Sequence, residues 1–154
     1  MKKQDFWNRT WSQPYGLYNR HHRDIWSAIK PTLKGKIADL GCGPAMIYQG
    51  TNVDVTGVDF SESAIREAQK NYPQGSFFVA EATDTKLPNS EFDAVVMFGL
   101  LDYFEDWTEV LTEARRILKP GGIMLATLLN GYKGRDWTRY KHVTGDWYLF
   151  EEQK

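Results

Sequence analysis

Two apolar runs in the chain each end in residues able to bind a ligand. The first run continues into Asp39-Leu40-Gly41-Cys42-Gly43-Pro44-Ala45, where glycines after a strand let the backbone approach a ligand closely. The second run ends in Asp59, about 20 residues after the first glycine, where a carboxylate can accept hydrogen bonds from two ribose hydroxyls. A ligand containing a nucleoside is therefore expected at the carboxyl ends of both strands. Two alternatives remain open: the glycines form only a tight turn, and Asp59 only caps the next helix.

A nicotinamide dinucleotide is a rival ligand for the same pattern. Its fingerprint G-x-G-x-x-G requires glycine at position 46, where the chain has Met46. Asp39 would also place a negative charge near the pyrophosphate, which is unfavourable. A cationic ligand without phosphate fits these residues better.

These residues depend on a regular alternation of short apolar runs and helical patterns between Lys36 and Leu128. Such alternation is typical of βαβ units and a mostly parallel sheet. The expected strands are Ile37–Leu40, Val55–Val58, Phe77–Ala80, Ala94–Phe98 and Ile123–Leu129.

Three helices are expected from apolar residues at helical spacing. They span Tyr18–Ile29, Ser61–Tyr72 and Trp107–Leu118. Ser61 is expected to cap the second helix, and Lys119-Pro120-Gly121-Gly122 to end the third in a turn.

Composition indicates one domain, residues 1–154, in a protein of balanced charge. The sequence has 19 Lys and Arg residues and 20 Asp and Glu residues, and neither sign of charge forms a long run. No nucleic-acid partner is therefore indicated. No transmembrane or signal sequence is predicted, and we expect a cytoplasmic protein without a membrane partner. The single cysteine, Cys42, cannot form an intrachain disulfide and is expected to act as a small packing residue in the glycine turn. No metal site is expected.

The stretches Ile37–Ala45 and Val55–Ser61 resemble the first two motifs of class I (Rossmann-like) S-adenosylmethionine-dependent methyltransferases of the small-molecule type. The resemblance continues through Glu81-Ala82, Glu91–Val96 and Ile117–Gly122, in family order, over roughly two-thirds of the chain. It implies an α/β fold: a Rossmann-like three-layer sandwich with a mostly parallel sheet. It also implies S-adenosyl-L-methionine as cofactor, S-adenosyl-L-homocysteine as product, and in-line methyl transfer to a small-molecule acceptor.

The resemblance assigns cofactor-binding roles along the core, residues 35–130. Residues that border the methionine part, the ribose, the adenine and the sulfonium would be, in chain order, Asp39, Gly41, Cys42, Gly43, Asp59, Phe60, Glu81, Ala82, Phe98 and Gly99. The chain departs from the family pattern in two places. Ala45 replaces the usual third glycine, and the stretch from Gly43 to Val55 is shorter by about one helical turn. Glu81 and Phe98 have a simpler alternative, as a solvated loop acid and a core aromatic.

No fixed catalytic residue is expected, because methyl transfer from a sulfonium depends on positioning and water exclusion. Candidates for a base are Asp102, Tyr103, His21 and His22. In related small-molecule methyltransferases a histidine often stands at about the position of Asp102, so a histidine mechanism there is in doubt. The two histidines are alternatively exposed residues of an N-terminal helix.

Aromatic residues are concentrated at both ends of the chain. In the N-terminal cap, residues 1–34, they are Phe6, Trp7, Trp11, Tyr15 and Tyr18, which form either a lid over the ligand or a strap over the core. An aromatic face suits a sulfonium through cation–π attraction.

The C-terminal segment, residues 131–154, looks too short for the family's last helix and two strands. We expect one strand at most, near Trp147–Glu151, with the terminal strands of the family reduced or missing. An open sheet edge beside Ile123–Leu129 would then recruit a second copy, giving a homodimer. Alternatively, residues 132–150 cap that edge within one chain, or the chain is a truncated form of a longer protein. The same shortness supports a second hypothesis, a non-catalytic S-adenosylmethionine-binding or partner-binding protein.

Overall fold

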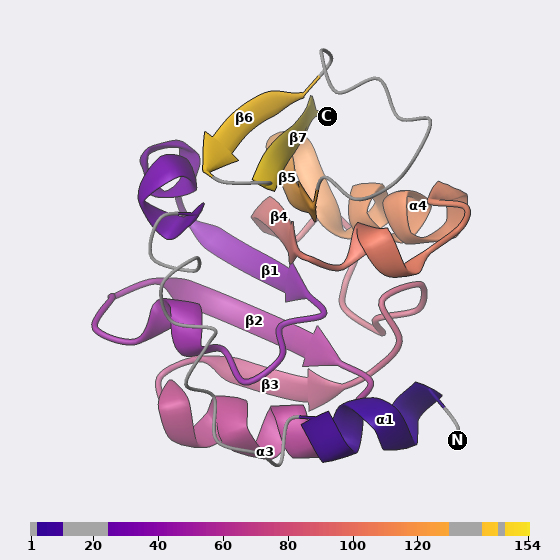
Figure 1. Cartoon of the computed structure of the whole chain (residues 1–154). Coiled ribbons are helices and arrows are strands. Elements are labelled where there is room, and N and C mark those ends of the chain that lie inside the picture. The colour runs from indigo at the N-terminus through magenta and orange to yellow at the C-terminus, as the bar shows by residue number, and fades with distance from the viewer. Residues whose placement is uncertain (1–2, 11–24, 130–139, 145–146) are drawn as a thin grey trace.

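A seven-stranded sheet forms the centre of the computed structural model, which describes residues 3–10, 25–129, 140–144 and 147–154 (Figure 1). Its strands are β1 (Lys36–Leu40), β2 (Asp54–Asp59), β3 (Ser76–Val79), β4 (Phe92–Phe98), β5 (Leu118–Leu129), β6 (Lys141–Thr144) and β7 (Trp147–Gln153). The α-helices are α1 (Lys3–Thr10), α3 (Glu62–Asn71) and α4 (Thr108–Ile117), and residues 25–29 are also helical. Short 3-10 helices are η1 (Lys30–Thr32), η2 (Met46–Tyr48) and η3 (Leu101–Tyr103). None of the helices in these ranges is long and apolar enough to cross a membrane.

The strand order is β3-β2-β1-β4-β5-β7-β6. The first five strands are parallel, whereas β7 runs antiparallel to β5 and β6 antiparallel to β7. The chain therefore moves outward from β1 to β3 and then returns to the other side of β1 at β4. Ligands of open parallel sheets bind outside the carboxyl ends of the strands at such a reversal point. In this sheet that point lies between β1 and β4.

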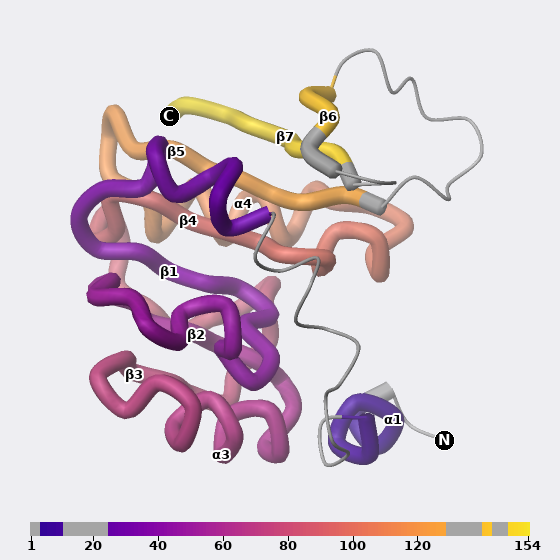
Figure 2. Tube along the Cα trace, turned by 60° about the vertical axis from the view of Figure 1, so that its left-hand side comes forward, coloured from indigo at the N-terminus to yellow at the C-terminus, as the bar shows by residue number. Residues whose placement is uncertain are grey.

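Strands β1, β2, β4 and β5 each contribute to two cores, one on each face of the sheet, whereas β3 contributes Phe77 to one of them. Because side chains alternate along a strand, Ile37 of β1 joins one core and Ala38 joins the other. The first core includes residues 25–29 and the inner face of α3, and the second includes the inner face of α4. The tube in Figure 2 shows the strands one above another from β5 to β3, with α3 beside β3 and β2. The predicted Rossmann-like α/β fold with a mostly parallel sheet is confirmed.

Local signals placed the start of α3 correctly. Ser61 is the N-cap, and its Oγ accepts a hydrogen bond from the Ala64 amide at 3.2 Å. The predicted turn at residues 119–122 is wrong, because β5 already begins at Leu118. A register shift opposite Phe92 and Ala94, together with a positive φ of 80° at Gly121, lets the strand pass through these residues as a bulge.

The expectation of reduced or missing terminal strands is also wrong. Two strands, β6 and β7, fit because only residues 145–146 connect them, so the pair consumes few residues. β7 pairs with β5 from Leu129↔Trp147 to Ile123↔Gln153. The predicted open edge beside β5 is therefore covered within one chain, and the argument for a homodimer at that edge loses its premise. Residues 132–139 lie outside the described part of the chain.

The loop between β3 and β4 is fixed to α4 by a buried carboxylate. Glu113 Oε1 accepts hydrogen bonds from the Thr85 amide at 2.8 Å and the Thr85 hydroxyl at 2.6 Å. Arg116 donates to both Glu113 oxygens at 2.7 Å and to the Leu87 carbonyl at 2.8 Å. These bonds, led by those from Arg116, lower the pKa of Glu113 to about 2. The loop is thus held by a charge-assisted network rather than by regular secondary structure.

We predict that Glu113→Gln lowers the free energy of unfolding at pH 7 by about 1.5–3 kcal/mol, the usual contribution of hydrogen bonds to a charged group. Because the folded pKa of Glu113 is lowered, its contribution is complete above the unfolded pKa near 4.5 and is lost as the pH falls toward 2. Urea unfolding of wild type and variant at several pH values measures this difference, which should shrink below pH 4.5. Glu109→Gln, an exposed position on the same helix, is the control. If the difference in the free energy of unfolding between wild type and Glu113→Gln stayed constant from pH 7 to the lowest pH measured, the lowered pKa of Glu113 would be contradicted.

Candidate functional site

The glycine turn after β1 is held by backbone hydrogen bonds to β2. The amides of Gly41 and Cys42 both donate to the Val58 carbonyl, at 2.8 and 3.0 Å. Gly41 has a φ of 71°, and a Cβ there would come within 2.7 Å of Leu100 Cδ1. Glycine is therefore required at position 41 both for the backbone conformation and for the close approach of the segment after β4.

Asp59 joins this turn to the start of α3. Its Oδ2 accepts from the Gly43 amide at 3.0 Å, and its Oδ1 accepts from the Ser61 amide at 2.8 Å. Burial raises the pKa of Asp59, and the two backbone donors counteract that effect. Since Ser61 itself caps α3, Asp59 is not the N-cap residue, although it orders the turn leading into the helix. A carboxylate offers about four acceptor positions, so two backbone bonds leave capacity for further donors.

Asp39 is a buried carboxylate whose hydrogen bonding is incomplete. Its side chain is only 1% exposed, and its Oδ2 accepts from the Tyr48 hydroxyl at 2.8 Å. Oδ1 has no hydrogen-bond partner among the described residues. Burial raises the pKa of Asp39 to about 8, the Tyr48 hydrogen bond lowers it, and the negative charge of Asp59 raises it. A buried polar atom without a partner is costly, so a donor from a ligand would complete this group.

Cys42 is a buried cysteine close enough to Asp39 and Asp59 to feel both charges. Its side chain is buried, and a Cβ on Gly57 of β2 would lie 2.8 Å from Cys42 Cβ. Burial, followed by the charges of Asp39 and Asp59, raises the pKa of the thiol. A thiol kept protonated is a poor nucleophile, in agreement with the predicted packing role.

The segments after β2 and β3 meet beside Asp59. The Ala80 amide donates to the Asp59 carbonyl at 3.1 Å, which brings the exposed Glu81 and the half-buried Ala82 next to that residue. The charge of Glu81 contributes to the raised pKa of Asp59. Phe60, also half-buried, completes this side of the site. The structure thus brings together the residues expected to contact ribose and adenine.

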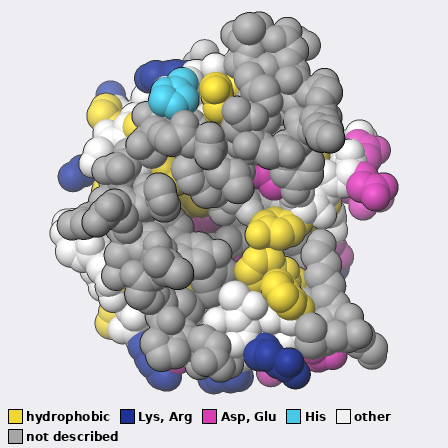
Figure 3. Space-filling model, viewed as in Figure 1, with side chains coloured by type: hydrophobic (Ala, Val, Ile, Leu, Met, Phe, Trp, Pro, Cys, Tyr) yellow, Lys and Arg dark blue, Asp and Glu magenta, His cyan; other side chains and the backbone are white. Residues whose placement is uncertain are grey.

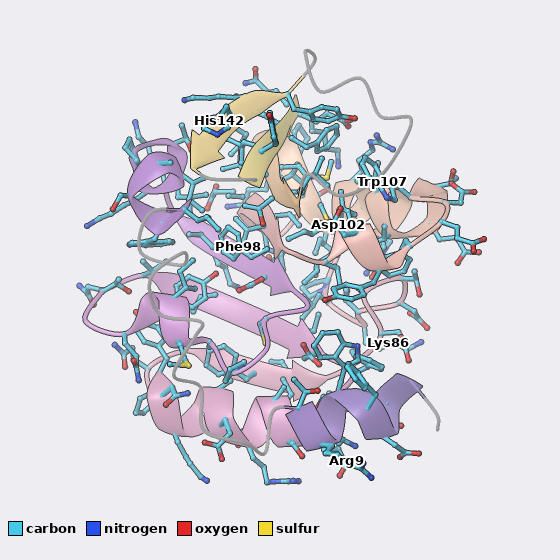
Figure 4. The ribbon with its side chains drawn as sticks, viewed as in Figure 1. Arg9, Lys86, Phe98, Asp102, Trp107 and His142 are labelled. Atoms are coloured by element: carbon cyan, nitrogen blue, oxygen red, sulfur yellow. The ribbon has the colours of Figure 1, made fainter. Side chains whose placement is uncertain are left out.

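The other side of the site is the end of β4. Phe98 is half-buried against the first core, and Gly99 turns the chain with a φ of 61°. The Gly99 amide donates to the hydroxyl of the fully buried Thr127 on β5, at 2.8 Å. This bond fixes the turn at the strand end, where Figure 4 shows Phe98 and, further along the chain, Asp102.

Of the four candidate bases, the structure places Asp102 and Tyr103 on η3, directly after this turn. Trp107 Nε1 donates to the Leu101 carbonyl at 2.9 Å and so holds η3 in place. Tyr103 is about half exposed, at 51%. His21 and His22 lie outside the described residues, as do Trp11, Tyr15 and Tyr18 of the predicted aromatic cap.

Helix α1 bridges the two sides of the site. Gln4 Nε2 donates to the Phe60 carbonyl at 2.8 Å, and Asn8 Oδ1 accepts from the Ser61 hydroxyl at 2.7 Å. On the opposite side, the Trp7 ring meets Tyr103 edge-on at a centroid distance of 5.1 Å. Figure 3 shows an apolar patch of side chains on this face of the molecule, beside α1. Of the predicted aromatic cap, the structure places Phe6 and Trp7 on α1, where their rings contact each other and Trp7 contacts Tyr103.

Sequence reasoning missed four residues that order the site: Gln4, Asn8, Tyr48 and Thr127. Each acts through a hydrogen bond to a residue at least nine positions away, and none belongs to a motif. The only signal was indirect: the shortened stretch after Gly43 contains Tyr48.

Solved structures share the fold of this chain. One, from work on the conversion of a disulfide bond into a thioacetal group during echinomycin biosynthesis, has a TM-score of 0.73 at 22% identity, covering 84% of this chain and 62% of that one. An S-adenosylmethionine-dependent methyltransferase from Mesorhizobium loti has a TM-score of 0.58 at 25% identity, covering 69% and 54%.

The curated relatives are named as methyltransferases of several kinds, and some of them act in quinone biosynthesis. The ubiquinone biosynthesis O-methyltransferase of Thiobacillus denitrificans is 30% identical over 68% of this chain and 49% of its own length. The demethylmenaquinone methyltransferase of Thermotoga maritima is 29% identical over 79% and 54%. The chain spans about half the length of the curated relatives it matches.

The family model described as "Methyltransferase domain" matches residues 38–126, from the first glycine motif to β5. This match covers more than half of the chain and includes every described residue of the predicted cofactor site. The chain therefore belongs to the methyltransferase domain family, the class I fold whose cofactor is S-adenosylmethionine.

Proposed function

We propose that this protein binds S-adenosylmethionine at the carboxyl ends of β1, β2 and β4 and transfers its methyl group to a small-molecule acceptor. The observation that carries the proposal is the buried Asp39 carboxylate, whose Oδ1 lacks a partner among the described residues beside the glycine turn. An α-ammonium group is a donor of the right charge for that oxygen.

The remaining predicted contacts fit the same ligand. Asp39, Gly41, Cys42 and Gly43 would border its methionine part, Cys42 through its backbone. Asp59 would accept hydrogen bonds from the ribose hydroxyls with the acceptor capacity that its two backbone bonds leave. Phe60, Glu81 and Ala82 would contact the adenine, while Phe98 and Gly99 would lie near the sulfonium.

The segment after the glycine turn argues against a dinucleotide. Pyrophosphate binding in Rossmann folds uses the amino end of an α-helix directly after the glycines. Here the glycines are followed by η2, a 3-10 helix of three residues, and Ala45 before it has a left-handed φ of 54°. Asp39, Asp59 and Glu81 also give this site an acidic character that would repel phosphate.

The chain contributes positioning and exclusion of water rather than a covalent group. S-adenosylmethionine, when bound, supplies a methyl group activated by its sulfonium. The Gly99–Thr127 bond fixes the strand end near the reacting atoms, and α1 with Tyr103 covers the site. Asp102 and Tyr103 are the described residues best placed to accept a proton from an acceptor.

The acceptor we propose is a small molecule, in keeping with the quinone-biosynthesis methyltransferases among the relatives. The alternative is a protein of the same fold that binds the cofactor without turnover. A methyl-acceptor screen that includes quinol precursors separates the two hypotheses. Methylated product supports the enzyme, and binding without turnover of any acceptor supports the alternative.

We predict that S-adenosylhomocysteine binds far more tightly than NAD or NADP, because the site is acidic and lacks a helix amino end after its glycines. Isothermal titration calorimetry with the three ligands measures this directly. A comparable affinity for NAD or NADP would contradict the proposal that this site binds S-adenosylmethionine.

We predict that Asp59→Ala weakens S-adenosylhomocysteine binding by about 1–3 kcal/mol, because the variant loses a charged acceptor for the ribose hydroxyls. Thermal unfolding checks that the variant stays folded, since Asp59 also holds the Gly43 and Ser61 amides. Asp54→Ala is the matched control: it is an exposed aspartate at the opposite end of β2. An unchanged dissociation constant in a folded Asp59 variant would show that this carboxylate only orders the turn.

A further inference from the structure

Tyr48 occupies the shortened stretch between the glycine turn and β2. Its side chain is fully buried, with 0% exposure, although it lies at the end of a 3-10 helix of only three residues. The Tyr48 ring contacts Trp26 edge-on at a centroid distance of 5.5 Å and Tyr72 in a tilted geometry at 5.7 Å. These rings hold the phenol in one orientation, so its hydroxyl has little freedom to turn away.

That hydroxyl is directed at the cofactor site. Among the described residues, the Tyr48 hydroxyl makes one hydrogen bond, which it donates to Asp39 Oδ2 at 2.8 Å. Asp39 belongs to the central strand β1, paired with β2 at Gly57 and with β4 at Val96, so its backbone is fixed as well. Because the Tyr48 hydroxyl holds Asp39 Oδ2 in place, the direction of the other carboxylate oxygen, Oδ1, is fixed as well.

We propose that Tyr48 is a positioning residue that holds Asp39 Oδ2, so that Oδ1 is presented to the α-ammonium group of S-adenosylmethionine. This inference rests on the proposed function, because it concerns how the same cofactor is held. It assigns to the shortened stretch a role in recognising the amino-acid end of the cofactor.

Charge gives this arrangement a measurable signature. Among the described residues, the titratable side chains that interact with Asp39 are Tyr48, Cys42 and Asp59, and none of these three is cationic. Burial raises the pKa of Asp39 to about 8, so an ammonium group binds best once the carboxylate has lost its proton. Affinity for an amine-bearing ligand should therefore increase as the pH rises toward 8. The Tyr48 bond favours the ionised form, so its loss moves this increase to higher pH.

Two ligands isolate the amino-acid end. S-adenosylhomocysteine carries the α-ammonium group, whereas 5′-methylthioadenosine has the same nucleoside and thioether without it. The ratio of their dissociation constants, measured by calorimetry from about pH 6 to about pH 8.5, reports on the ammonium contact alone. In the wild type we expect S-adenosylhomocysteine to gain affinity over this range and 5′-methylthioadenosine to change little.

In Tyr48→Phe, we expect S-adenosylhomocysteine to bind about tenfold more weakly at pH 7, equivalent to a shift of about one unit in the pKa of Asp39. Binding of 5′-methylthioadenosine should stay within about twofold of wild type. The pH at which S-adenosylhomocysteine gains affinity should move upward. A purely structural role would weaken both ligands together and leave the pH profile in place.

Tyr72→Phe is the matched control. Tyr72 is an equally buried tyrosine in contact with Tyr48, but its hydroxyl bonds the Val53 amide at 2.8 Å and carbonyl at 2.9 Å rather than Asp39. The Tyr72→Phe variant should have lower thermal stability but an unchanged ratio of the dissociation constants of S-adenosylhomocysteine and 5′-methylthioadenosine. In an Asp39→Asn background, Tyr48→Phe should have little further effect on the ratio, because the two residues act as one unit.

The inference is overturned if Tyr48→Phe keeps the wild-type ratio and pH profile, or if it weakens both ligands equally. If Tyr48→Phe does not fold, Asp39→Asn tests the same contact: it should weaken S-adenosylhomocysteine and leave 5′-methylthioadenosine within about twofold of wild type, and equal weakening of both ligands overturns the inference. Failure of the wild type to bind S-adenosylhomocysteine at all would instead reject the proposed function.

Discussion

The two oxygens of Asp59 connect segments that parallel strand pairing alone would leave separate. Backbone hydrogen bonds from Gly41 and Cys42 to Val58 hold the beginning of the glycine turn against β2, but they do not reach Gly43 or the start of α3. Asp59 fixes both by accepting one amide from Gly43 and one from Ser61. The Asp59 carbonyl then receives the amide of Ala80 after β3. Three consecutive loops are thereby held around one buried carboxylate, and α1 packs on the ordered end of α3 through Asn8.

Much of the fold was predictable because its signals are local. In a strand such as Ala94–Phe98, successive side chains point into two different cores. The sequence of such a strand is therefore almost continuously apolar and easy to recognise. Ser61 as a cap and Asp59 at a strand end are likewise read from positions a few residues apart. The chemistry of the ligand followed from the same short segments. The residues that complete the site were not predictable, because Tyr48 and Thr127 contact it only after distant segments have met.

The C-terminal strands show how a length argument can fail. The expectation of one strand assumed that a helix and long connections must precede a second. The structure instead joins β6 and β7 through two residues and pairs β7 with β5 along its length. The pairing extends to the last residue, where Lys154 exchanges backbone hydrogen bonds with Gly121 and Gly122 at 3.0 Å. Arg115 on α4 also bonds Glu152 through two nitrogens, at 2.6 and 2.9 Å. Side-chain contacts with α4 therefore reinforce an edge that sequence patterning left open.

Crowding of acidic groups links the stability of the site to the charge of its ligand. Asp39 and Asp59 are both buried. The negative charge of Asp59 raises the pKa of Asp39, and the charges of both raise the pKa of the Cys42 thiol. Burying two charged carboxylates is electrostatically unfavourable, and this is why the pKa of Asp39 is raised and why Asp59 needs its two backbone donors. In the proposed site, a ligand carrying an ammonium and a sulfonium would reduce that cost, whereas one carrying a pyrophosphate would increase it. Selectivity for the ligand would then arise from the same burial that raises the pKa of Asp39, and on our proposal Tyr48 determines which Asp39 oxygen faces the ligand.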